Sequence, residues 1–288
     1  MPELPEVEVV KKSLKNKIID LSFRKVLINT NKLRYTINKD LNKIIINKKI
    51  LSIDRRSKYI LINLEKNITI LTHLGMTGKF FLVDKKKIHS KTSFYYKISN
   101  RDKKHNHVIF FLNNDTKLIY NDIRKFGFIK IISTKDISKN KHLETLGPEP
   151  LSKKFNLGYF EKKASNKKKN LKNILMDQSF VAGLGNIYVN EILHLSSLNP
   201  YKSIKKLDIK DVKKIIYFTK KILKKSILDG GSSIKNFNNS DGKDGVFQQQ
   251  FKVYGRNNKK CTKNYCKGII KKSIISNRST FYCTRCQK

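Results

Sequence analysis

The four cysteines of this 288-residue chain all lie in its last 28 residues. They form two close pairs, Cys261-x4-Cys266 and Cys283-x2-Cys286, separated by 16 residues. Two close pairs of thiolates are typical of a closed tetrahedral zinc site, and their position in one short segment argues against a disulfide framework. The first spacer is wider than the usual x2, yet it remains compatible with a zinc knuckle. The tail is therefore expected to fold around one structural Zn²⁺, the alternative being four unrelated free cysteines.

The segment between the cysteine pairs is expected to form a β-hairpin. Residues 268–275 and 279–282 supply its strands, with Asn277 and Arg278 at the tip, a position suited to insertion into a nucleic-acid groove. The formal net charge of +41, from 63 Lys+Arg against 22 Asp+Glu, also favours a polyanionic partner. Heavy use of Lys, Ile and Asn is typical of AT-rich coding as well, so the charge supports nucleic-acid binding without proving it.

Length and hydropathy limit the class of protein. A chain of 288 residues exceeds the usual single domain, so two domains are the default expectation. No apolar run approaches the ~18 residues of a membrane span. The N-terminus carries acidic residues where a signal peptide would carry basic ones. A soluble, cytoplasmic protein with no membrane partner is expected.

The first half of the chain predicts one helix followed by a β-sandwich. Pro5 suits a first helical turn, and apolar residues then recur at helical spacing: Val7, Val10, Leu14 and Ile18. Short apolar runs predict strands at residues 59–64, 68–74, 94–98, 107–112, 117–120 and 128–132. Residues 65–67 are expected to form a hairpin turn between the first two. Several short strands after a single helix favour a β-sandwich.

The second half of the chain predicts helices. The prolines at 148 and 150 beside Gly147 indicate a boundary or hinge. Residues 170–176 and 187–195 predict two helices that meet at a tight turn, Gly183-Leu184-Gly185. A longer helix is expected to end at Gly230-Gly231, with one apolar face formed by Ile209, Val212, Ile216, Leu223 and Ile227. Residues 232–247 lack periodicity and have the length of a functional loop.

The N-terminus offers a candidate nucleophile. The chain begins MPELPEVE, and removal of Met1 would leave Pro2 with a free secondary amine. An α-amino group has a pKa of ~7.7–8.0, so part of it is uncharged at neutral pH and can attack an aldehyde-like carbon. Glu3 is adjacent and could serve as a general acid or base. On Pro2 alone, a disordered terminus with a chance proline would be the favoured interpretation.

Further motifs follow the octapeptide in a fixed order along the whole chain. They are RRSKY at residues 55–59, HLGMTG at 73–78, DIRKFG at 122–127, LGPEP at 146–150, GLGNIY at 183–188 and VYGR at 253–256, ahead of the four cysteines. Together they resemble the bacterial formamidopyrimidine-DNA glycosylases, the base-excision repair enzymes that remove oxidised purines. The resemblance implies an α+β fold, with an N-terminal β-sandwich flanked by helices. It also implies a C-terminal helical domain with a helix-two-turns-helix element and a β-hairpin zinc finger.

The same resemblance implies domain limits and partners. Residues 1–136 would form the catalytic sandwich, 137–150 a hinge, 151–257 the helical DNA-binding domain with a lesion-capping loop, and 258–288 the zinc-finger hairpin. The expected partner is damaged double-stranded DNA, bound by a monomer at the bacterial nucleoid. Zn²⁺ is the one expected cofactor, and no nucleotide cofactor is expected.

The implied activity is that of a bifunctional glycosylase and abasic-site lyase. The Pro2 nitrogen would attack C1′ of the damaged nucleoside, expel the base and form a Schiff base, after which β- and δ-elimination would cut the strand. Glu3 would protonate the sugar ring oxygen, and Lys58 would reach the phosphate and the catalytic carboxylate. Glu6 would shape the damaged-base pocket. On sequence alone, a carboxylate that complements the positive helix end is an equal alternative for Glu6.

The target base must leave the duplex to be reached, and other groups must fill the gap. The resemblance implies that Met76, Arg124 and Phe126 enter the stack, with Arg124 hydrogen-bonded to the orphaned base. Taken alone, Met76 and Phe126 would be interpreted as core residues. The family usually has Pro and Arg where this chain has Ile123 and Lys125, which puts the rigidity of the loop and one donor in doubt.

Contacts to DNA are implied for a larger set: His107, Arg124, Lys167, Asn186, Lys235, Tyr254 and Arg278. Asn186 opens a predicted helix, where it could hold a phosphate, serve as an N-cap, or both. His107 lies in a strand pattern and could be structural or phosphate-facing. The lysines before the helical corner also fit phosphate contacts: Lys167, Lys168, Lys169 and Lys172.

Two alternative functions can be distinguished from this one by sequence features. An endonuclease VIII-like enzyme for oxidised pyrimidines would share the terminal proline. That branch usually has Gly where Leu4 stands, and it lacks the paired insertion residues. A non-catalytic, zinc-containing nucleic-acid-binding protein would explain the charge and the cysteines. Such a protein would have no need of the Pro2-Glu3 terminus.

Overall fold

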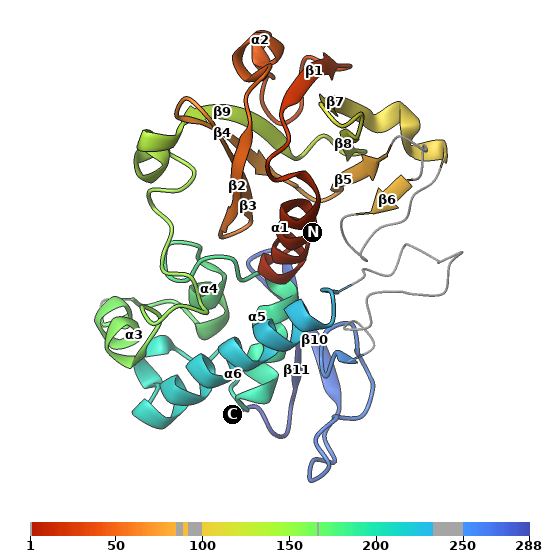
Figure 1. Ribbon diagram of the computed structural model, residues 1–288. Helices are drawn as coiled ribbons and strands as arrows, with labels where there is room; N and C mark the ends of the chain where they lie inside the picture. The colour runs from red at the N-terminus through yellow and green to blue at the C-terminus, as the bar shows by residue number, and fades with distance from the viewer. Residues whose placement is uncertain (1, 85–88, 92–99, 166, 233–249) are drawn as a thin grey trace. The chain divides into compact units, whose positions relative to one another are not determined.

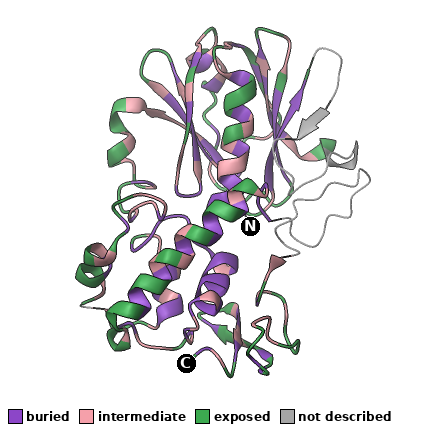
Figure 2. Ribbon diagram, turned by 60° about the horizontal axis from the view of Figure 1, so that its bottom comes forward, coloured by how far each residue is buried: buried purple, intermediate pink, exposed green. Residues whose placement is uncertain are grey.

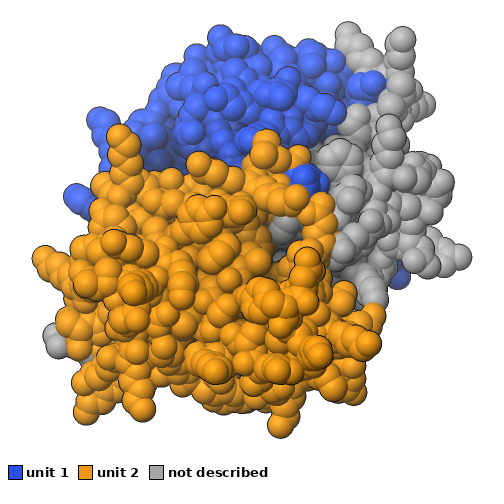
Figure 3. All heavy atoms as spheres, turned by 90° about the horizontal axis from the view of Figure 1, so that it is seen from below, with its two compact units in different colours: residues 1–144, 229–246 blue, residues 145–228, 247–288 orange. Residues whose placement is uncertain are grey.

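The chain divides into two units (Figure 3). Each unit has its own hydrophobic core. In the computed structural model, unit 1 comprises Met1–Glu144 and Asp229–Val246, and unit 2 comprises Thr145–Leu228 and Phe247–Lys288. The structure describes all residues except 1, 85–88, 92–99, 166 and 233–249. Among the described residues, no helix is both long enough and apolar enough to cross a membrane.

Unit 1 begins with helix α1 (Leu4–Ile18) (Figure 1). Its N-terminal residues and its apolar stripe both favour a helix. Pro5 lies in the first turn, where its missing N–H costs nothing. The predicted stripe is confirmed, since Val7, Val10, Leu14 and Ile18 are all buried. The helix packs against β2 and β3, two neighbouring strands whose bounds are given in the next paragraph. Figure 2 shows this division of α1 into a buried and an exposed face.

The rest of unit 1 consists of two antiparallel sheets that share one core. The first has the order β1-β7-β8-β5-β6, and the second has the order β2-β3-β4-β9. The strands are β1 (Phe23–Ile28), β2 (Ile50–Arg56), β3 (Tyr59–Leu64), β4 (Ile68–His73), β5 (Gly78–Val83), β6 (His89–Lys91), β7 (Asn106–Leu112), β8 (Lys117–Asp122) and β9 (Phe128–Ser133). The described part of the unit also contains three short helical segments: α2 (Leu41–Ile45), η1 (Asn100–His105) and η2 (Thr134–Lys139).

Most of the predicted strands are confirmed. Leu64 pairs with Ile68 around the expected turn at 65–67. The strand predicted at 59–64 has the predicted ends, and the observed ends of β4, β7, β8 and β9 differ from the predicted ones by one or two residues. The predicted strand at 94–98 lies outside the described residues. Among the described residues, strands β1, β2, β5 and β6 were not predicted. Polar residues interrupt the apolar residues of β1 and β2, and β6 has only three residues, whereas the apolar run 80–83 of β5 was overlooked.

Unit 2 is helical and ends in a hairpin. Its elements are α3 (Leu157–Ala164), α4 (Leu171–Met176), α5 (Asn186–Leu195), η3 (Ile204–Lys206), α6 (Ile209–Leu228), β10 (Ile270–Ile275) and β11 (Arg278–Cys283). The two predicted helices at the Gly183 corner are confirmed as α4 and α5. Helix α3 was not predicted.

Two predictions in unit 2 were wrong in detail. The buried face of α6 consists of Asp211, Val212, Ile215, Thr219, Ile222, Leu223 and Ser226, whereas Ile209 is 55% exposed. The apolar pattern misled because polar residues occupy this face; the Ser226 hydroxyl, for example, lies 2.6 Å from the Tyr188 hydroxyl. Arg278 is the first residue of β11 and pairs with Ile275, so Ser276 and Asn277 form the hairpin tip.

Candidate active site and nucleic-acid interface

The first turn of α1 holds the residue next to Pro2 in one geometry. Glu3 is the N-cap residue, and its N–H donates to Glu6 Oε2 at 2.8 Å. In return the Glu3 side chain accepts from the backbone of Glu6, which completes a capping box. Pro2 is buried, and Glu3 and Glu6 are each 2% exposed. The chain therefore enters α1 with little freedom at Pro2-Glu3.

The Glu6 carboxylate also holds a segment that is distant in sequence. Its Oε1 accepts from both the N–H and the hydroxyl of Ser232, each at 2.8 Å. Gly231 adopts φ +84°, and a Cβ there would lie 3.3 Å from Glu6 Oε1, so glycine permits this approach. Glu6 therefore makes two sets of contacts: one carboxylate oxygen caps α1, and the other holds Ser232 at the start of the predicted lesion-capping loop. The rest of that loop, including Lys235, lies outside the described residues.

Lys58 lies in the tight turn between β2 and β3 and is 8% exposed. The neighbouring Ser57 has φ +55°, and its carbonyl accepts from Arg55 Nη1 at 2.8 Å. Arg55 Nε in turn donates to Glu8 Oε2 of α1 at 2.7 Å. Burial raises the pKa of Glu8, but the hydrogen bonds from Lys11 and Arg55 outweigh it and leave the pKa lowered. This ion pair ties the turn that carries Lys58 to the helix that carries Glu3.

His73 ends β4 in a neutral form. Burial, followed by the positive charges of Lys58, Arg34 and His142, lowers its pKa to about 4. Its Nδ1 accepts from the Gly75 N–H at 3.0 Å, so the ring proton resides on Nε2. The imidazole therefore shapes the turn that begins the HLGMTG motif.

Two loops that are distant in sequence touch through glycine. Gly75 has φ +61°, and a Cβ there would lie 2.4 Å from Gly127 N and 2.5 Å from the carbonyl carbon of Phe126. A Cβ on Gly127 would lie 1.9 Å from the Tyr120 hydroxyl. Neither position can take a larger residue without moving backbone. The loops that present Met76 and Phe126 are thereby held side by side.

Asp122 holds both loops through one buried carboxylate. Its Oδ1 accepts from the Thr77 hydroxyl, and its Oδ2 accepts from the Gly127 N–H at 2.8 Å. The Thr77 hydroxyl oxygen accepts from the Arg124 N–H at 3.0 Å. Asp122 is fully buried, so these charge-assisted bonds are not weakened by water. Sequence reasoning missed this role, because an acid at the end of a predicted strand carries no other signal.

The loops expose apolar side chains that the core does not use. Met76 is 41% exposed, Ile123 42% and Phe126 46%. The Arg124 guanidinium lies 4.5 Å from the centre of the Phe126 ring, a cation–π contact that orients both groups. The interpretation of Met76 and Phe126 as core residues is thus wrong. Ile123 belongs to this exposed group, and Lys125 takes φ +54°.

His107 of β7 is 4% exposed, and its Nε2 lies 2.8 Å from the carbonyl oxygen of Asp122. Burial lowers its pKa, so the neutral ring donates through Nε2. The structure thus places His107 against the backbone of the residue that joins the two loops.

In unit 2, a glutamine builds the helical corner. Gln178 Oε1 accepts from the Gly183 N–H at 2.9 Å, and Gln178 Nε2 donates to the Leu184 carbonyl at 2.8 Å. Gly183 has φ +86°, a conformation that favours glycine. Gly185 is the N-cap residue of α5, and Asn186 is the first helical residue. The interpretation of Asn186 as the N-cap was therefore wrong by one residue.

The same corner anchors the start of β11. Asn186 Nδ2 donates to the Ser279 carbonyl at 2.9 Å, and Lys172 Nζ donates to the same carbonyl at 3.1 Å and to the Thr280 hydroxyl at 2.6 Å. Asn190 Oδ1 accepts from the Phe281 N–H at 2.7 Å. These bonds bring Asn186 and exposed Arg278 to one end of unit 2. Lys172 is only 1% exposed and its ammonium donates to β11, which does not favour its interpretation as a phosphate contact.

Tyr254 is oriented by a buried carboxylate on α5. Glu191 accepts from three consecutive backbone N–H groups, those of Lys252, Val253 and Tyr254, at 2.8–3.0 Å. Burial raises the pKa of Glu191, although these hydrogen bonds oppose the shift. The Tyr254 ring contacts Phe281 edge-on at 5.2 Å. Lys167 lies near the corner and is half-buried.

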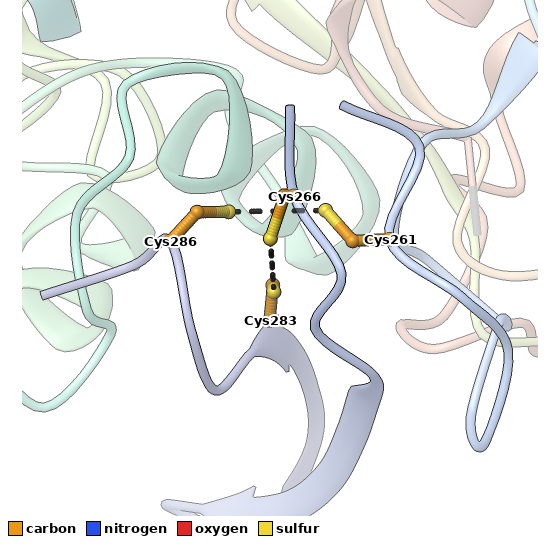
Figure 4. A group of neighbouring side chains, drawn as sticks. All are labelled: Cys261, Cys266, Cys283 and Cys286. Atoms are coloured by element: carbon orange, nitrogen blue, oxygen red, sulfur yellow. Dashed lines mark hydrogen bonds between the residues drawn. The ribbon is translucent and has the colours of Figure 1, made fainter. Parts of the chain in front are cut away.

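The four cysteine sulfurs point toward one centre (Figure 4). All lie within 4.8 Å of one another, with Cys261–Cys286 at 3.8 Å and Cys266–Cys283 at 3.6 Å. A tetrahedron with Zn–S bonds of about 2.3 Å places its sulfurs about 3.8 Å apart. A Cβ on Gly268 would lie 2.6 Å from Cys283 Sγ, so this glycine makes room for the sulfurs. The group could hold one metal ion.

Comparisons with known proteins agree over the whole chain. The model of the formamidopyrimidine-DNA glycosylase N-terminal domain matches residues 1–129, and that of the formamidopyrimidine-DNA glycosylase H2TH domain matches residues 146–238. The formamidopyrimidine-DNA glycosylase of Rickettsia bellii is 42% identical over 288 residues, with 100% of both chains covered. That of Rickettsia canadensis is 40% identical, covering 100% of this chain and 99% of its own.

Solved structures agree with the fold. A complex between a Lactococcus lactis FPG mutant and a Fapy-dG containing DNA matches with a TM-score of 0.86 at 31% identity, covering 100% of both chains. A complex between Lactococcus lactis Fpg and an abasic site containing DNA matches with a TM-score of 0.85 at 31% identity, covering 99% of each.

Proposed function

The chain belongs to the formamidopyrimidine-DNA glycosylase family, and on that premise we propose that it excises oxidised purines from damaged double-stranded DNA during base excision repair. It acts as a glycosylase and an abasic-site lyase. The observation that carries the proposal is the first turn of α1, where the Glu3–Glu6 capping box fixes the chain immediately after Pro2.

Pro2 is the proposed nucleophile. With Met1 removed, its secondary amine attacks C1′ of the damaged nucleoside, the base departs, and a Schiff base links enzyme and sugar. Glu3 donates a proton to the sugar ring oxygen as the C1′–O bond opens. The Schiff base acidifies the 2′ proton, and β- and then δ-elimination release the strand ends. Lys58 contributes a positive charge beside the phosphate, in a turn tied to α1 through Arg55 and Glu8.

The exposed loop residues take the place of the extruded base. Met76 and Phe126 stack within the gap, and Arg124 hydrogen-bonds the orphaned partner. Their exposure and the pinning of both loops by Asp122 support this role. In unit 2, Asn186, Tyr254 and Arg278 contact phosphates. His107, Lys167 and Lys235 complete the proposed DNA-binding set.

Zn²⁺ is the metal proposed for the four cysteines. Four thiolates at these separations fit its tetrahedral preference and leave no open position, so the ion is structural. When bound, it links the segment before β10 to the end of β11 and so holds the hairpin that carries Arg278.

The proposed domains are the sandwich (1–136), a hinge (137–150), the helical DNA-binding domain (151–257) and the zinc-finger hairpin (258–288). The change from unit 1 to unit 2 between Glu144 and Thr145 supports a hinge there. Because the proposed substrate is bacterial chromosomal DNA, the proposal places the protein in the cytoplasm, acting as a monomer at the nucleoid.

Borohydride trapping on a duplex with 8-oxoguanine opposite cytosine tests the mechanism. The reductant converts the Schiff base into a stable amine, so wild-type protein should give a covalent adduct and Pro2→Gly should give none. No wild-type adduct, together with tight DNA binding, would favour the non-catalytic alternative. A thymine glycol duplex tests the endonuclease VIII alternative, because faster cleavage of that pyrimidine lesion would contradict the purine preference.

A further inference from the structure

The widened spacer of the first cysteine pair forms one wall of a groove in unit 2. The groove has a volume of about 840 Å³, and the DNA-binding residues proposed above do not line it. Its other wall is α6, with two lysines and two aromatic residues, and its floor is the end of α5 with the two residues that follow. From the spacer come Lys263, Asn264 and Tyr265.

The spacer is fixed in place and presents an aromatic ring to solvent. The Lys263 ammonium donates to the Ser197 hydroxyl, which ties the spacer to the end of α5. Lys263 Nζ lies 5.9 Å from the centre of the Tyr265 ring. Tyr265 is 77% exposed, and Tyr217 on the opposite wall is 57% exposed. Two exposed tyrosines beside one groove are typical of a contact surface, because tyrosine is enriched where proteins meet.

The rim of the groove is positive. Lys213, Lys214 and Lys263 line it, and none of the described lining residues is Asp or Glu. The nearby Asp211 carboxylate is held by Lys202 at 2.7 Å and lies 3.9 Å from Lys214. A segment with acidic side chains would therefore complement this rim.

The floor of the groove favours a polypeptide over a nucleic-acid strand. It is the C-terminal end of α5, whose carbonyls carry the negative end of the helix dipole. The carbonyls of Ile192, Leu193 and His194 already accept from backbone N–H groups, but the negative end of the dipole still disfavours phosphate. Ser196 lines the groove at 1% exposure, and its hydroxyl has no hydrogen-bond partner among the described residues.

The groove is also remote from the proposed phosphate contacts. Asn186 begins the ten-residue α5 and the groove lies at its other end, about 14 Å away at the rise of a helix. On the hairpin, Arg278 adjoins the tip while Cys283 ends the same strand beside the cysteine cluster. The groove therefore remains available when Asn186 and Arg278 engage DNA.

We propose that this groove binds an acidic polypeptide segment of a partner protein. One apolar side chain of the segment is seated between Tyr217 and Tyr265, and its flanking carboxylates contact Lys213, Lys214 and Lys263. The volume suits a side chain with a short stretch of backbone. The x4 spacer thus has a use that zinc binding alone does not require.

Fluorescence anisotropy with the full-length, zinc-loaded protein tests the proposal. The probes are labelled short peptides of Asp and Glu around one central Phe, Tyr, Leu or Ile. We expect saturable binding that weakens about tenfold or more in Tyr265→Ala and in Lys213→Glu. Lys224→Glu, an exposed change on α6 outside the groove, is the matched control and should bind like wild type.

Three results would overturn the proposal. The first is that none of these peptides binds saturably, and the second is that wild type and both groove variants bind them equally. The third is that the groove variants lose binding to oligo-dT while no peptide binds. Zinc content and circular dichroism establish that each variant is folded. Borohydride trapping should be unchanged in the groove variants, so loss of peptide binding is distinguishable from failure of the proposed enzyme activity.

Discussion

A single glycine decides how closely the four cysteine sulfurs can approach. We expect Gly268→Ala to reduce zinc content and lower the melting temperature, because the added methyl would lie 2.6 Å from Cys283 Sγ and 2.7 Å from Arg285 Cβ. Mass spectrometry under native conditions and thermal unfolding are the measurements.

Gly158→Ala is the matched control. A Cβ there would meet nothing closer than 3.8 Å, and alanine in α3 should stabilise the helix by about 0.5–1 kcal/mol. Equal zinc content in Gly268→Ala and wild type would contradict the steric argument.

His73 should make stability depend on pH in a defined window. The unfolded histidine protonates near pH 6.5, whereas the folded one does so at about 4, so the unfolded state binds more protons between these values. Stability is therefore unaffected above about pH 6.5 and falls by at most about 3 kcal/mol as the pH drops to about 4. Urea unfolding of wild type and His73→Gln measures the difference.

Another buried histidine requires that comparison. His194 also has a pKa of about 4, chiefly through burial, and acts in the same window, so only the difference between the two proteins isolates His73. Histidine NMR should show the His73 ring neutral at pH 5. Protonation near pH 6.5 in the folded protein would refute the prediction.

At the scale of elements, the strand β11 depends on a buried lysine for its position. We expect Lys172→Met to weaken binding to an abasic-site duplex by at most about 1–3 kcal/mol. That range is the cost of leaving a buried group such as the Thr280 hydroxyl without its 2.6 Å donor, and the position of Arg278 depends on this bond. Electrophoretic mobility shift assays provide the affinities.

Lys168→Met tests whether charge alone explains such a loss. It removes one cation from an exposed position near the same corner and leaves β11 untouched. A loss as large as that of Lys172→Met would show that long-range charge, and not the position of β11, is responsible.

Elements were predictable where pattern and burial agree. The stripe of α1 and the β3–β4 hairpin follow directly from spacing and turn residues. The buried face of α6 could not be predicted from spacing, because Thr219 and Ser226 are buried among its isoleucines. The roles of Asp122 and Lys172 could not be predicted either, since a buried charge depends on partners that only the folded chain brings near: Thr77 and Gly127 for one, Ser279 and Thr280 for the other.

For the whole molecule, the net charge of +41 should exceed by far the number of phosphates contacted. Proteins that make about 6–10 phosphate contacts lose affinity with salt at a logarithmic slope of about −5 to −9, and we expect a slope in that range. Arg278→Ala should reduce its magnitude by ~1. Lys15→Ala, at an exposed position on α1, should leave it unchanged. A much steeper slope would mean that the abundant lysines bind DNA collectively.

The carboxylate of Asp122, shared between Thr77 and Gly127, has a consequence for protein engineering. Two loops that use one acid and touch at Gly75 cannot be exchanged separately between relatives. If residues 122–127 alone came from a relative, the transferred residue 122 would have to bond to the Thr77 of this chain. The two loops form one structural unit, so chimeras should transfer residues 73–78 and 122–127 together.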